Sequence, residues 1–433
     1  MPFETPAAAP RRIAVIGAGI SGLAAAHMLG RAHRVVLFEA EKRFGGHART
    51  VIAGKRGDQP VDTGFIVFNH ATYPHLTRLF AELDVPVMES TMSFGASFDG
   101  GRFEYALQSL DSLFAQRRNA LDPRYLRMLR DILRFFGKGG RIRDRPEMTV
   151  DGMVHALGLG RWFRDRFLLP FSGAIWSTPA ENIGAFPAAA LIRFFENHAL
   201  LQYSGQHQWY TVRGGSIEYV RRLEAALRAQ GAELRAGAPV AGVRRDEAGV
   251  EIRVNGGLWE RFDEVVFACH SDQALTMLAD ASGEERAALA QIRYQPNRAL
   301  LHADPGVMPV RRKCWASWVY TETAGQDRSG PISLSYWMNS LQPAIPAEDA
   351  MFVTLNARRP IREELVYDEA VFHHPVYDLG TLAGQAAIRD LNGQRHSWFC
   401  GAWMRNGFHE DGIASAVDVA EAIARRDADL VAA

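Results

Sequence analysis

Residues 12–29 read RIAVIGAGISGLAAAHML, an apolar run followed by a glycine-rich turn and a second apolar run. The glycines form the pattern G-x-G-x-x-G at Gly17, Gly19 and Gly22. In dinucleotide-binding folds the first glycine permits a tight turn, the second lets backbone approach a pyrophosphate, and the third lets helix and strand pack closely. We therefore predict a strand, a phosphate-binding turn that includes Ser21, and a helix.

The next apolar run, VVLFEA at residues 35–40, supports this interpretation because it ends in an acid. A carboxylate at Glu39 is suited to bind both hydroxyls of an adenosine ribose, and it disfavours a 2′-phosphate. A second strand with an acid at its end makes the glycine motif much more specific than the motif alone.

Residues 43–50, RFGGHART, indicate a cofactor longer than NAD. The paired glycines Gly45 and Gly46 can turn backbone N–H groups toward a second phosphate and a ribityl chain, and Arg43 or Arg49 can neutralise phosphate. Gly64 follows in a further glycine-bearing strand, DTGFIVF. Together these elements predict FAD as the cofactor.

With these motifs the chain resembles the flavin-containing amine oxidase and phytoene desaturase superfamily, whose members carry R-x-G-G-R-x-x-T/S after the acid. This sequence has His47 where the second arginine of that motif stands. The resemblance is narrower for a bacterial subgroup of NAD/FAD-binding oxidoreductases associated with fatty-acyl modification, which shares VDTGFIVFN, AIWSTP, YWMNSLQ and GFHEDGI.

The resemblance implies further cofactor contacts. A valine at the position of Val240 contacts adenine through its backbone, and the C-terminal motif brings a helix N-terminus to the pyrimidine edge of the flavin. We expect that helix to open at Gly412, where its dipole favours negative charge on the reduced ring. The cofactor-binding residues added in this way are His47, Val240, Gly401, Asp411, Gly412 and Ile413.

The fold class that follows is α/β combined with α+β, similar to the amine oxidases. A Rossmann-like FAD-binding domain, a doubly wound parallel sheet with a β-meander, is expected to be interleaved with a substrate domain of mixed sheet and helices. The FAD-binding domain is assigned to residues 1–70, 212–290 and 391–433, and the substrate domain to residues 71–211 and 291–390.

The substrate segments are rich in aromatic residues, which suit an apolar pocket over a flavin. Trp176, Trp337 and Phe408 are the predicted pocket residues, and Phe408 matches the position of an aromatic-cage residue in amine oxidases. His409 is a candidate proton acceptor because it directly precedes the predicted flavin-facing helix. The full set of candidate catalytic residues is His409, Glu410 and Tyr336.

The subgroup resemblance implies a desaturase or dehydrogenase that transfers hydride from a lipid acyl chain, branched or methylated and carried on a phospholipid, to flavin N5. An unactivated C–H bond is a poor hydride donor, so we expect attack beside a double bond or a branch. The alternatives are an amine oxidase that produces hydrogen peroxide, a flavin-dependent isomerase and a non-catalytic flavoprotein partner. Many relatives hold a water near N5 with a lysine, but this sequence has Asn297 and Arg298 there, which weakens the amine oxidase alternative.

Bulk composition excludes several other classes of protein. Lys+Arg and Asp+Glu each total 49, so the balanced charge gives no case for nucleic acid binding. Three scattered cysteines are too few for a disulfide framework or a zinc site, so we expect a cytoplasmic protein without a metal. No signal peptide or transmembrane run is apparent, so any membrane contact is expected to be peripheral, at the inner face of the membrane.

One segment departs from the neutral average. The helix predicted near residues 122–137 has an apolar stripe and lies among ten basic and three acidic residues between positions 117 and 145. A solvated basic face over a packed core helix is the simplest interpretation, and attraction to anionic lipid headgroups is the alternative.

Overall fold

The glycine motif folds as its pattern predicts, with β1 (Arg12–Ile16) leading through the turn into α1 (Ile20–Leu29). β1 lies at the centre of a five-stranded parallel sheet with strand order β10-β2-β1-β14-β20. The computed structural model describes residues 9–145, 147–198, 200–201, 207–323, 325 and 328–432, so residues 1–8 of the predicted FAD-binding domain lie outside it. The other strands of this sheet are β2 (Arg34–Phe38), β10 (Glu233–Arg235), β14 (Glu264–Phe267) and β20 (Ser397–Phe399).

Both faces of this sheet are covered, as a parallel sheet of apolar strands requires. Ile13 and Val15 point to one side, where they pack with α1, α10 (Ile217–Ala229) and α15 (His409–Ala432). Ala14 and Ile16 point to the other side, where a three-stranded meander and three further helices complete the core. Those elements are β11 (Val240–Asp246), β12 (Gly249–Val254), β13 (Trp259–Phe262), α11 (Ser271–Met277), α12 (Gly283–Leu289) and α14 (Leu379–Leu391). The doubly wound sheet and its meander are therefore confirmed.

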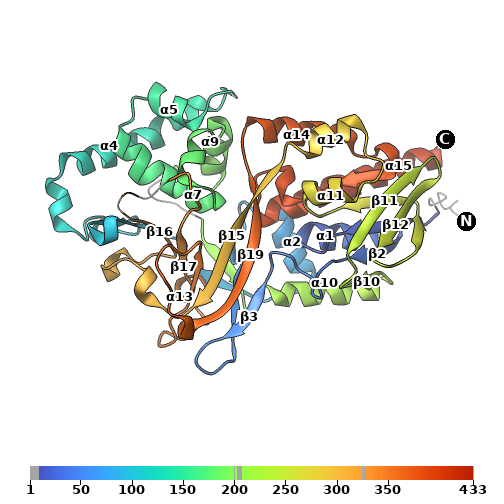
Figure 1. Cartoon of the computed structure of the whole chain (residues 1–433), viewed down its shortest axis with the longest axis horizontal. Helices are drawn as coiled ribbons and strands as arrows, with labels where there is room; N and C mark the ends of the chain where they lie inside the picture. The colour runs from blue at the N-terminus through green and yellow to red at the C-terminus, as the bar shows by residue number, and fades with distance from the viewer. Residues whose placement is uncertain are drawn as a thin grey trace, which may run out of the picture.

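A second, mixed sheet of seven strands forms the other half of the molecule, in the order β19-β15-β18-β17-β16-β7-β8. Its two longest strands pair antiparallel between the two halves, as Figure 1 shows. The strands are β7 (Phe94–Phe98), β8 (Phe103–Ala106), β15 (Arg293–His302), β16 (Trp318–Glu322), β17 (Leu334–Trp337), β18 (Phe352–Leu355) and β19 (Val366–Val376).

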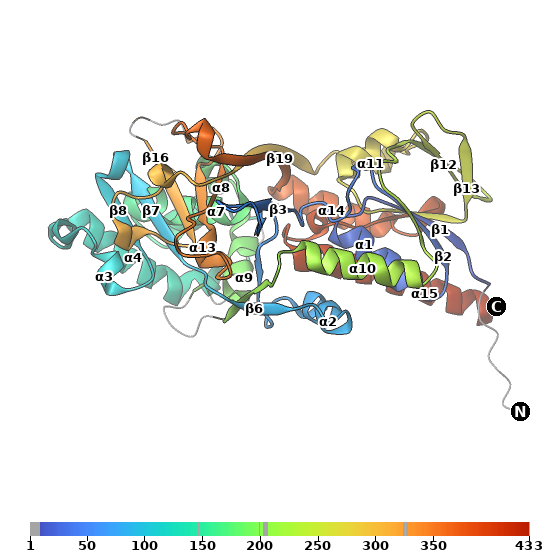
Figure 2. The same cartoon turned by 90° about the horizontal axis from the view of Figure 1, so that it is seen from below.

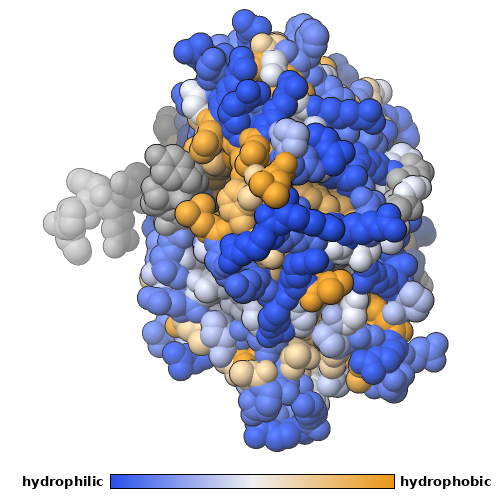
Figure 3. Space-filling view, turned by 90° about the vertical axis from the view of Figure 1, so that its left-hand side faces the viewer, coloured by the Kyte–Doolittle hydropathy of each residue, from blue (hydrophilic) through white to orange (hydrophobic). Residues whose placement is uncertain are grey.

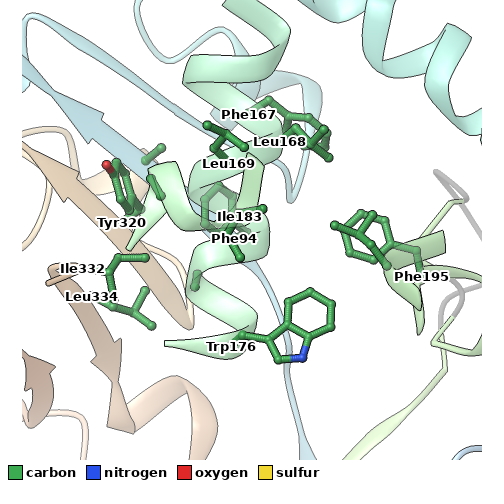
Figure 4. Packing of buried hydrophobic residues seen from close by; sticks show 14 of the residues in the cluster. Phe94, Phe167, Leu168, Leu169, Trp176, Ile183, Phe195, Tyr320, Ile332 and Leu334 are labelled. Carbon is green, nitrogen blue, oxygen red and sulfur yellow. The ribbon is translucent and has the colours of Figure 1, made fainter. Parts of the chain in front are cut away.

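Helices cover the far end of the mixed sheet. Seen from below in Figure 2, α3 (Leu110–Leu113) and α4 (Pro123–Lys138) lie at the end opposite the parallel sheet. Figure 4 shows α7 (Leu169–Trp176) packed between the sheet residues Phe94, Tyr320 and Leu334 and the helix residue Phe195. The other helices of this half are α5 (Val150–Ala156), α6 (Arg161–Phe163), α8 (Ala180–Gly184) and α9 (Ala188–Asn197).

Two helices from the predicted substrate segments pack with the nucleotide-binding half instead. α2 (Pro74–Glu82) contributes Leu76, Leu79 and Phe80 to the core that contains α1 and α15. α14 contributes Ile388 and Leu391 to the core on the meander side. The nucleotide-binding half therefore extends beyond its predicted boundaries, because both helices bury an apolar stripe in the cores of this half.

Two small antiparallel sheets link the halves. One pairs β3 (Thr50–Ala53) with β4 (Gln59–Asp62), and the other has the order β5-β9-β6. The second sheet consists of β5 (Val67–Phe68), β6 (Val87–Ser90) and β9 (Trp209–Val212). Within the described residues, no helix is long and apolar enough to cross a membrane.

Candidate functional site

One large cavity runs from the glycine turn of β1 and α1 to the aromatic face of α7. Its volume is about 1350 Å³, and residues of both halves line it. A typical small-molecule site occupies about 300–1,000 Å³. The cavity is therefore large enough for a dinucleotide together with a second molecule.

The glycine turn forms one end of the cavity. Gly17 has φ +100°, and a Cβ there would lie 2.9 Å from the carbonyl oxygen of Ala268 on the neighbouring strand. A Cβ at Gly19 would meet no atom within 4 Å, so this residue opens directly into the cavity. Ser21 and Glu39 line the same end. These predicted cofactor residues are brought together as the motif requires.

Glu39 also holds the turn in place. Its carboxylate accepts hydrogen bonds from the backbone N–H of Ala18 at 2.7 Å and of Glu41 at 2.9 Å. These bonds fix the acid at the carboxyl end of β2, next to the turn that it was predicted to accompany. Val240, predicted to contact adenine, lines the cavity near this end, as does Met277 of α11.

Two glycines of the motifs are needed for close packing. A Cβ at Gly22 would lie 1.8 Å from the carbonyl oxygen of Gly17, and one at Gly64 would lie 2.0 Å from that of His47. No side chain fits at such distances, so Gly22 lets α1 pack onto β1. Gly64 lets the segment between β4 and β5, where a strand was predicted, pack against the second glycine loop.

The second glycine loop is held by its own arginine. Arg43 donates hydrogen bonds to the carbonyls of Gly46 at 2.8 Å and Ala48 at 3.2 Å, and it is absent from the described cavity lining. This geometry favours a bracing role for Arg43 over the predicted phosphate contact. Gly45 bends the loop at φ +114°, whereas Gly46 and His47 line the cavity.

The described residues fit an FAD molecule. The glycine turn and the N-terminus of α1 form a cradle that a side chain at Gly19 would fill, and such a helix end attracts phosphate. The buried hydroxyl of Tyr377, which also lines the cavity, has no hydrogen-bond partner within the described structure. A bound molecule with polar atoms along its length is consistent with both observations.

The C-terminal motif lies at the middle of the cavity, but its helix begins earlier than predicted. α15 begins at His409, so Gly412 lies within its first turn and donates its N–H to the carbonyl of Phe408 at 3.0 Å. A Cβ at Gly412 would lie 2.8 Å from Ile20 of α1. The predicted opening at Gly412 is therefore wrong, and this glycine allows α15 to pack closely on α1.

The residues around Gly412 divide between two environments. Gly401, Phe408 and His409 line the cavity, whereas Asp411 and Ile413 are absent from its described lining. Asp411 accepts a hydrogen bond from the backbone N–H of Phe408 at 2.9 Å, and burial raises the pKa of its carboxyl to about 7. The structure thus favours a helix-capping role for Asp411 over the predicted cofactor contact, and a core role for Ile413.

Glu410 points away from the cavity. Its carboxylate accepts the backbone N–H groups of His75 and Leu76, both at 3.0 Å, in the first turn of α2. Burial raises the pKa of Glu410 despite these bonds. This arrangement is that of a carboxylate at a helix N-terminus, and it favours a structural role over the predicted catalytic one.

His409 is in the cavity but is poorly suited to accept a proton. Its ring stacks on Phe65 with centroids 3.8 Å apart, and its Nε2 lies 3.0 Å from the Tyr219 hydroxyl. Burial lowers the pKa of His409 to about 3. A group with this pKa holds a proton weakly near neutral pH, so the geometry favours a positioning role.

The predicted pocket aromatics lie on two sides of the sheet. Tyr336 of β17 lines the cavity, and burial raises its pKa to about 12. Trp337 points to the opposite face, where its ring packs at 5.6 Å from that of Trp315. The prediction for Trp337 is therefore wrong, because adjacent strand residues point to opposite faces. Trp176 lines the cavity, and its Nε1 donates to the carbonyl of Asn406 at 3.2 Å.

His47, a predicted cofactor residue, belongs to a cluster of histidines in the cavity whose other members, His270 and His374, were not predicted as part of the site. The ring of His47 lies 5.6 Å from that of His374 and 6.3 Å from that of His270, which stacks on Tyr294 at 4.2 Å. Burial lowers the pKa of His47 and of His270 to about 4, and that of His374 to about 3. All three are therefore neutral near pH 7, and the described residues include no group arranged to hold a metal ion.

A chain of amides fixes the tautomer of His374. Asn356 accepts the backbone N–H of Arg298 at 3.0 Å and donates to the carbonyl of Ile332 at 3.0 Å, which sets its orientation. Asn356 also donates to the side-chain oxygen of Asn297 at 2.7 Å. The amide nitrogen of Asn297 must then donate to Nδ1 of His374, 2.8 Å away. Neutral His374 consequently carries its proton on Nε2.

Asn297 therefore holds His374 by a hydrogen bond. In many relatives the resemblance implies a lysine at this position of the chain. Two features of the sequence belong to this group: the asparagine at position 297 of β15 and the HH pair in β19. Neither feature identifies its partner, because β15 and β19 are more than 60 residues apart in sequence.

Comparisons with known proteins identify the family of this chain. The model of the family described as flavin containing amine oxidoreductase matches residues 20–409. Hydroxyneurosporene desaturase from Cereibacter sphaeroides is 29% identical over 269 residues, which cover 54% of this chain and 51% of the desaturase. The chain thus spans about half the length of this curated relative.

Two solved structures share the fold. A fatty acid isomerase from P. acnes that produces CLA has a TM-score of 0.67 at 14% identity, covering 96% of this chain and 98% of the isomerase. Cyclohexylamine oxidase from Brevibacterium oxydans has a TM-score of 0.69 at 16% identity, covering 97% and 99%. The predicted superfamily, its fold and its FAD cofactor are confirmed. The chain belongs to the family of flavin-containing amine oxidoreductases, which are FAD-dependent enzymes.

Proposed function

We propose that this protein oxidises the acyl chain of a lipid, and that it forms a carbon–carbon double bond. The observation that carries this proposal is the chemical character of the cavity beyond the glycine turn. Apolar and aromatic side chains line that end, and the described lining there includes no Asp, Glu, Lys or Arg. The aromatic and apolar members include Phe94, Phe171, Ile175, Trp176, Phe194, Trp318 and Phe408.

This lining favours an uncharged chain over an amine. A protonated amine carries a charge, and burying a charge without a partner costs several kcal/mol. Each methylene of an acyl chain, in contrast, gains about 0.8 kcal/mol on leaving water. The fold relatives include both a fatty acid isomerase and an amine oxidase, and the lining supports the acyl chain among the substrates that the fold leaves open.

The reaction removes two hydrogen atoms from adjacent carbons: one is transferred as hydride and the other is released to solvent as a proton. Bound FAD supplies the two-electron acceptor for the hydride. Phe408, stacked on Phe194 with centroids 4.7 Å apart, and Trp176 enclose the chain and keep water away from the reacting carbons. The Tyr336 hydroxyl and the Nε2–H of His374 are polar groups of the lining available to orient an oxygen atom, whether of water or of the lipid.

Attack is expected beside a double bond or a branch, because such positions stabilise the developing charge better than a plain chain. The test is to mix FAD-loaded protein anaerobically with detergent-dispersed phospholipids whose acyl chains contain one double bond. We expect the visible flavin absorbance to bleach and a product with two fewer hydrogen atoms to form.

Two variants make this test specific. Ile175→Asp adds a carboxylate to the cavity lining and should slow acyl oxidation by at least about tenfold, because an unpaired buried charge is costly. Ile52→Asp, at a β3 residue that is 61% exposed, is the matched control and should behave as wild type. Bleaching by amines with no response to lipid would refute the proposal. A shifted double bond with no loss of hydrogen would identify an isomerase.

A further inference from the structure

The end of the molecule that carries α3 and α4 exposes an unusual number of leucines. Five of the eleven large hydrophobic side chains that are exposed in the described structure fall between positions 107 and 133. Figure 3 shows that this end, at the left of Figure 1, carries a hollow of hydrophobic residues surrounded by hydrophilic ones. The five are Leu107 (38% exposed), Leu110 (77%), Leu121 (86%), Leu126 (45%) and Leu133 (59%).

On α4 the leucines share their face with arginines. The inner face of the helix buries Tyr125, Met128, Ile132 and Phe135. The outer face presents Leu126 and Leu133, two turns apart and therefore aligned, with Arg130 between them. A helix that is only solvated on its outer face has no need of leucines there.

The surrounding charge is strongly positive. Ten basic residues and three acidic ones lie between positions 117 and 145, and one of the acids, Asp131, is fully buried. Asp131 pairs with Arg127 and Arg130, whose side chains remain 60% and 66% exposed. The basic residues are Arg117, Arg118, Arg124, Arg127, Arg130, Arg134, Lys138, Arg141, Arg143 and Arg145.

The cavity opens beside these leucines. At its apolar end, the lining includes the exposed residues Thr91, Leu107 and Gln108. Leu107 belongs to both features, because it lines the cavity and is one of the five exposed leucines. Leu110, in the first position of α3, follows three residues later.

We propose that this end docks on the surface of an anionic phospholipid bilayer. The exposed leucines would enter the boundary between headgroups and acyl chains, and the arginines would bind the phosphates around them. A protein partner would need an acidic surface with apolar sockets, whereas a bilayer offers both features without a specific fit. The inference rests on the proposed function only in one respect: the docked cavity mouth would receive an acyl chain without exposing it to water.

Vesicle flotation tests the docking independently of catalysis. FAD-loaded protein is mixed with vesicles of equal parts phosphatidylglycerol and phosphatidylcholine, and with vesicles of phosphatidylcholine alone. We expect the protein to float with the first and to remain in solution with the second. Added salt should release it, because the attraction between exposed charges is screened.

Paired variants identify the surface. The double variants Arg130→Glu with Arg134→Glu, and Leu126→Asp with Leu133→Asp, should each lower the bound fraction at least about tenfold. The matched controls are Arg286→Glu and Leu258→Asp, at exposed positions of the nucleotide-binding half, and both should float as wild type does. All four proteins should oxidise detergent-dispersed lipid equally, because none of these residues lines the cavity.

The outcomes separate this inference from the proposed function. Wild-type protein that stays in solution with anionic vesicles, or double variants that float like wild type, would overturn the docking. Wild-type protein that floats and loses this property in the variants, yet oxidises no lipid, would support the docking and count against the proposed function. Equal binding to both vesicle types would show that the arginines play no part and would also overturn the inference.

Discussion

Gly19 and Gly22 lie three residues apart, yet a methyl group added to each would meet very different surroundings. At Gly19 the Cβ would have no neighbour within 4 Å, at a φ of −72° that alanine adopts readily. At Gly22 it would lie 1.8 Å from a backbone oxygen. Gly19 therefore leaves room for the ligand, whereas Gly22 allows the close packing that the fold requires.

We expect Gly19→Ala to leave the unfolding free energy of the apoprotein within about 1 kcal/mol of wild type, and to weaken FAD binding at least about tenfold. Gly22→Ala should lower the unfolding free energy by about 3 kcal/mol or more, because backbone must move to admit the methyl group. FAD titration and thermal unfolding of both apoproteins measure these effects. Wild-type affinity in Gly19→Ala would show that the cofactor does not approach this turn.

The tautomer of His374 gives a second prediction at this scale. Aspartate at position 297 can only accept, so Asn297→Asp should draw the His374 proton to Nδ1 and raise the pKa of His374 through its negative charge. Nitrogen NMR of histidine-labelled protein distinguishes the two tautomers, with the exposed His155 as the internal reference. A wild-type signal from Nδ1–H would contradict the amide chain described above.

At the scale of single elements, sequence patterns located the helices and strands better than their ends and faces. The start of α15 was placed at Gly412 because glycine often opens a helix, but this glycine is required by the contact with Ile20. A better signal was Asp411, three residues after Phe408, since an acid in the first turn often accepts the N–H of the capping residue. From one sequence, a glycine that opens a helix cannot be distinguished from a glycine that allows two helices to pack closely.

Strand faces posed a similar problem. Tyr336 and Trp337 are both aromatic, and alternation requires that only one of them faces the cavity. The choice depends on which face of β17 meets α7 and which meets the small core of Trp315 and Phe352. That information comes from the packing of the whole sheet and is absent from the local sequence.

The bond between Glu410 and α2 can be tested as an interaction between two elements. Glu410→Gln keeps the shape of the side chain but removes its charge, so it should destabilise the protein by about 1 kcal/mol through weaker bonds to His75 and Leu76. Turnover should be unchanged, because the carboxylate lies outside the cavity. Thermal unfolding and steady-state kinetics of this variant test both statements. A large loss of turnover with unchanged stability would restore the catalytic role first predicted for Glu410.

At the scale of the whole molecule, the interleaving of two domains follows from the order of the motifs. Strands of the parallel sheet come from three separate parts of the chain, as the positions of the glycine motif, the meander and the C-terminal motif predicted. His47 and His409 were each predicted as site residues, but their grouping with His270 and His374 in one cavity could not be predicted in this way. These histidines come from a loop after β2, the start of α11, β19 and the start of α15, and they meet only when both halves are assembled.

Five histidines with lowered pKa values line the cavity, and they should make the folded protein sensitive to acid. Burial lowers the pKa of His47, His198 and His270 to about 4 and that of His374 and His409 to about 3, whereas an unfolded histidine has a pKa near 6.5. Above pH 6.5 neither state binds these protons, and the full stability is present. As the pH falls from 6.5 toward 4, only the unfolded state binds them, so the unfolding free energy decreases.

Within this window each such histidine lowers the unfolding free energy by about 1.4 kcal/mol for each pH unit of acidification. Burial of Asp411 and Asp62 acts in the opposite direction, because their raised pKa values, about 7 and about 6, let the folded state hold protons that the unfolded state has lost. We therefore expect a net slope smaller than that of the five histidines alone, but still a fall in stability from pH 6.5 to pH 4.5. Urea unfolding at several pH values measures the slope.

His270→Phe keeps the stack on Tyr294 and removes one titrating group, so it should reduce the slope by about one histidine's share, whereas the exposed control His155→Gln should not. An unchanged slope in His270→Phe would mean that this histidine is protonated as easily in the folded protein as in the unfolded chain.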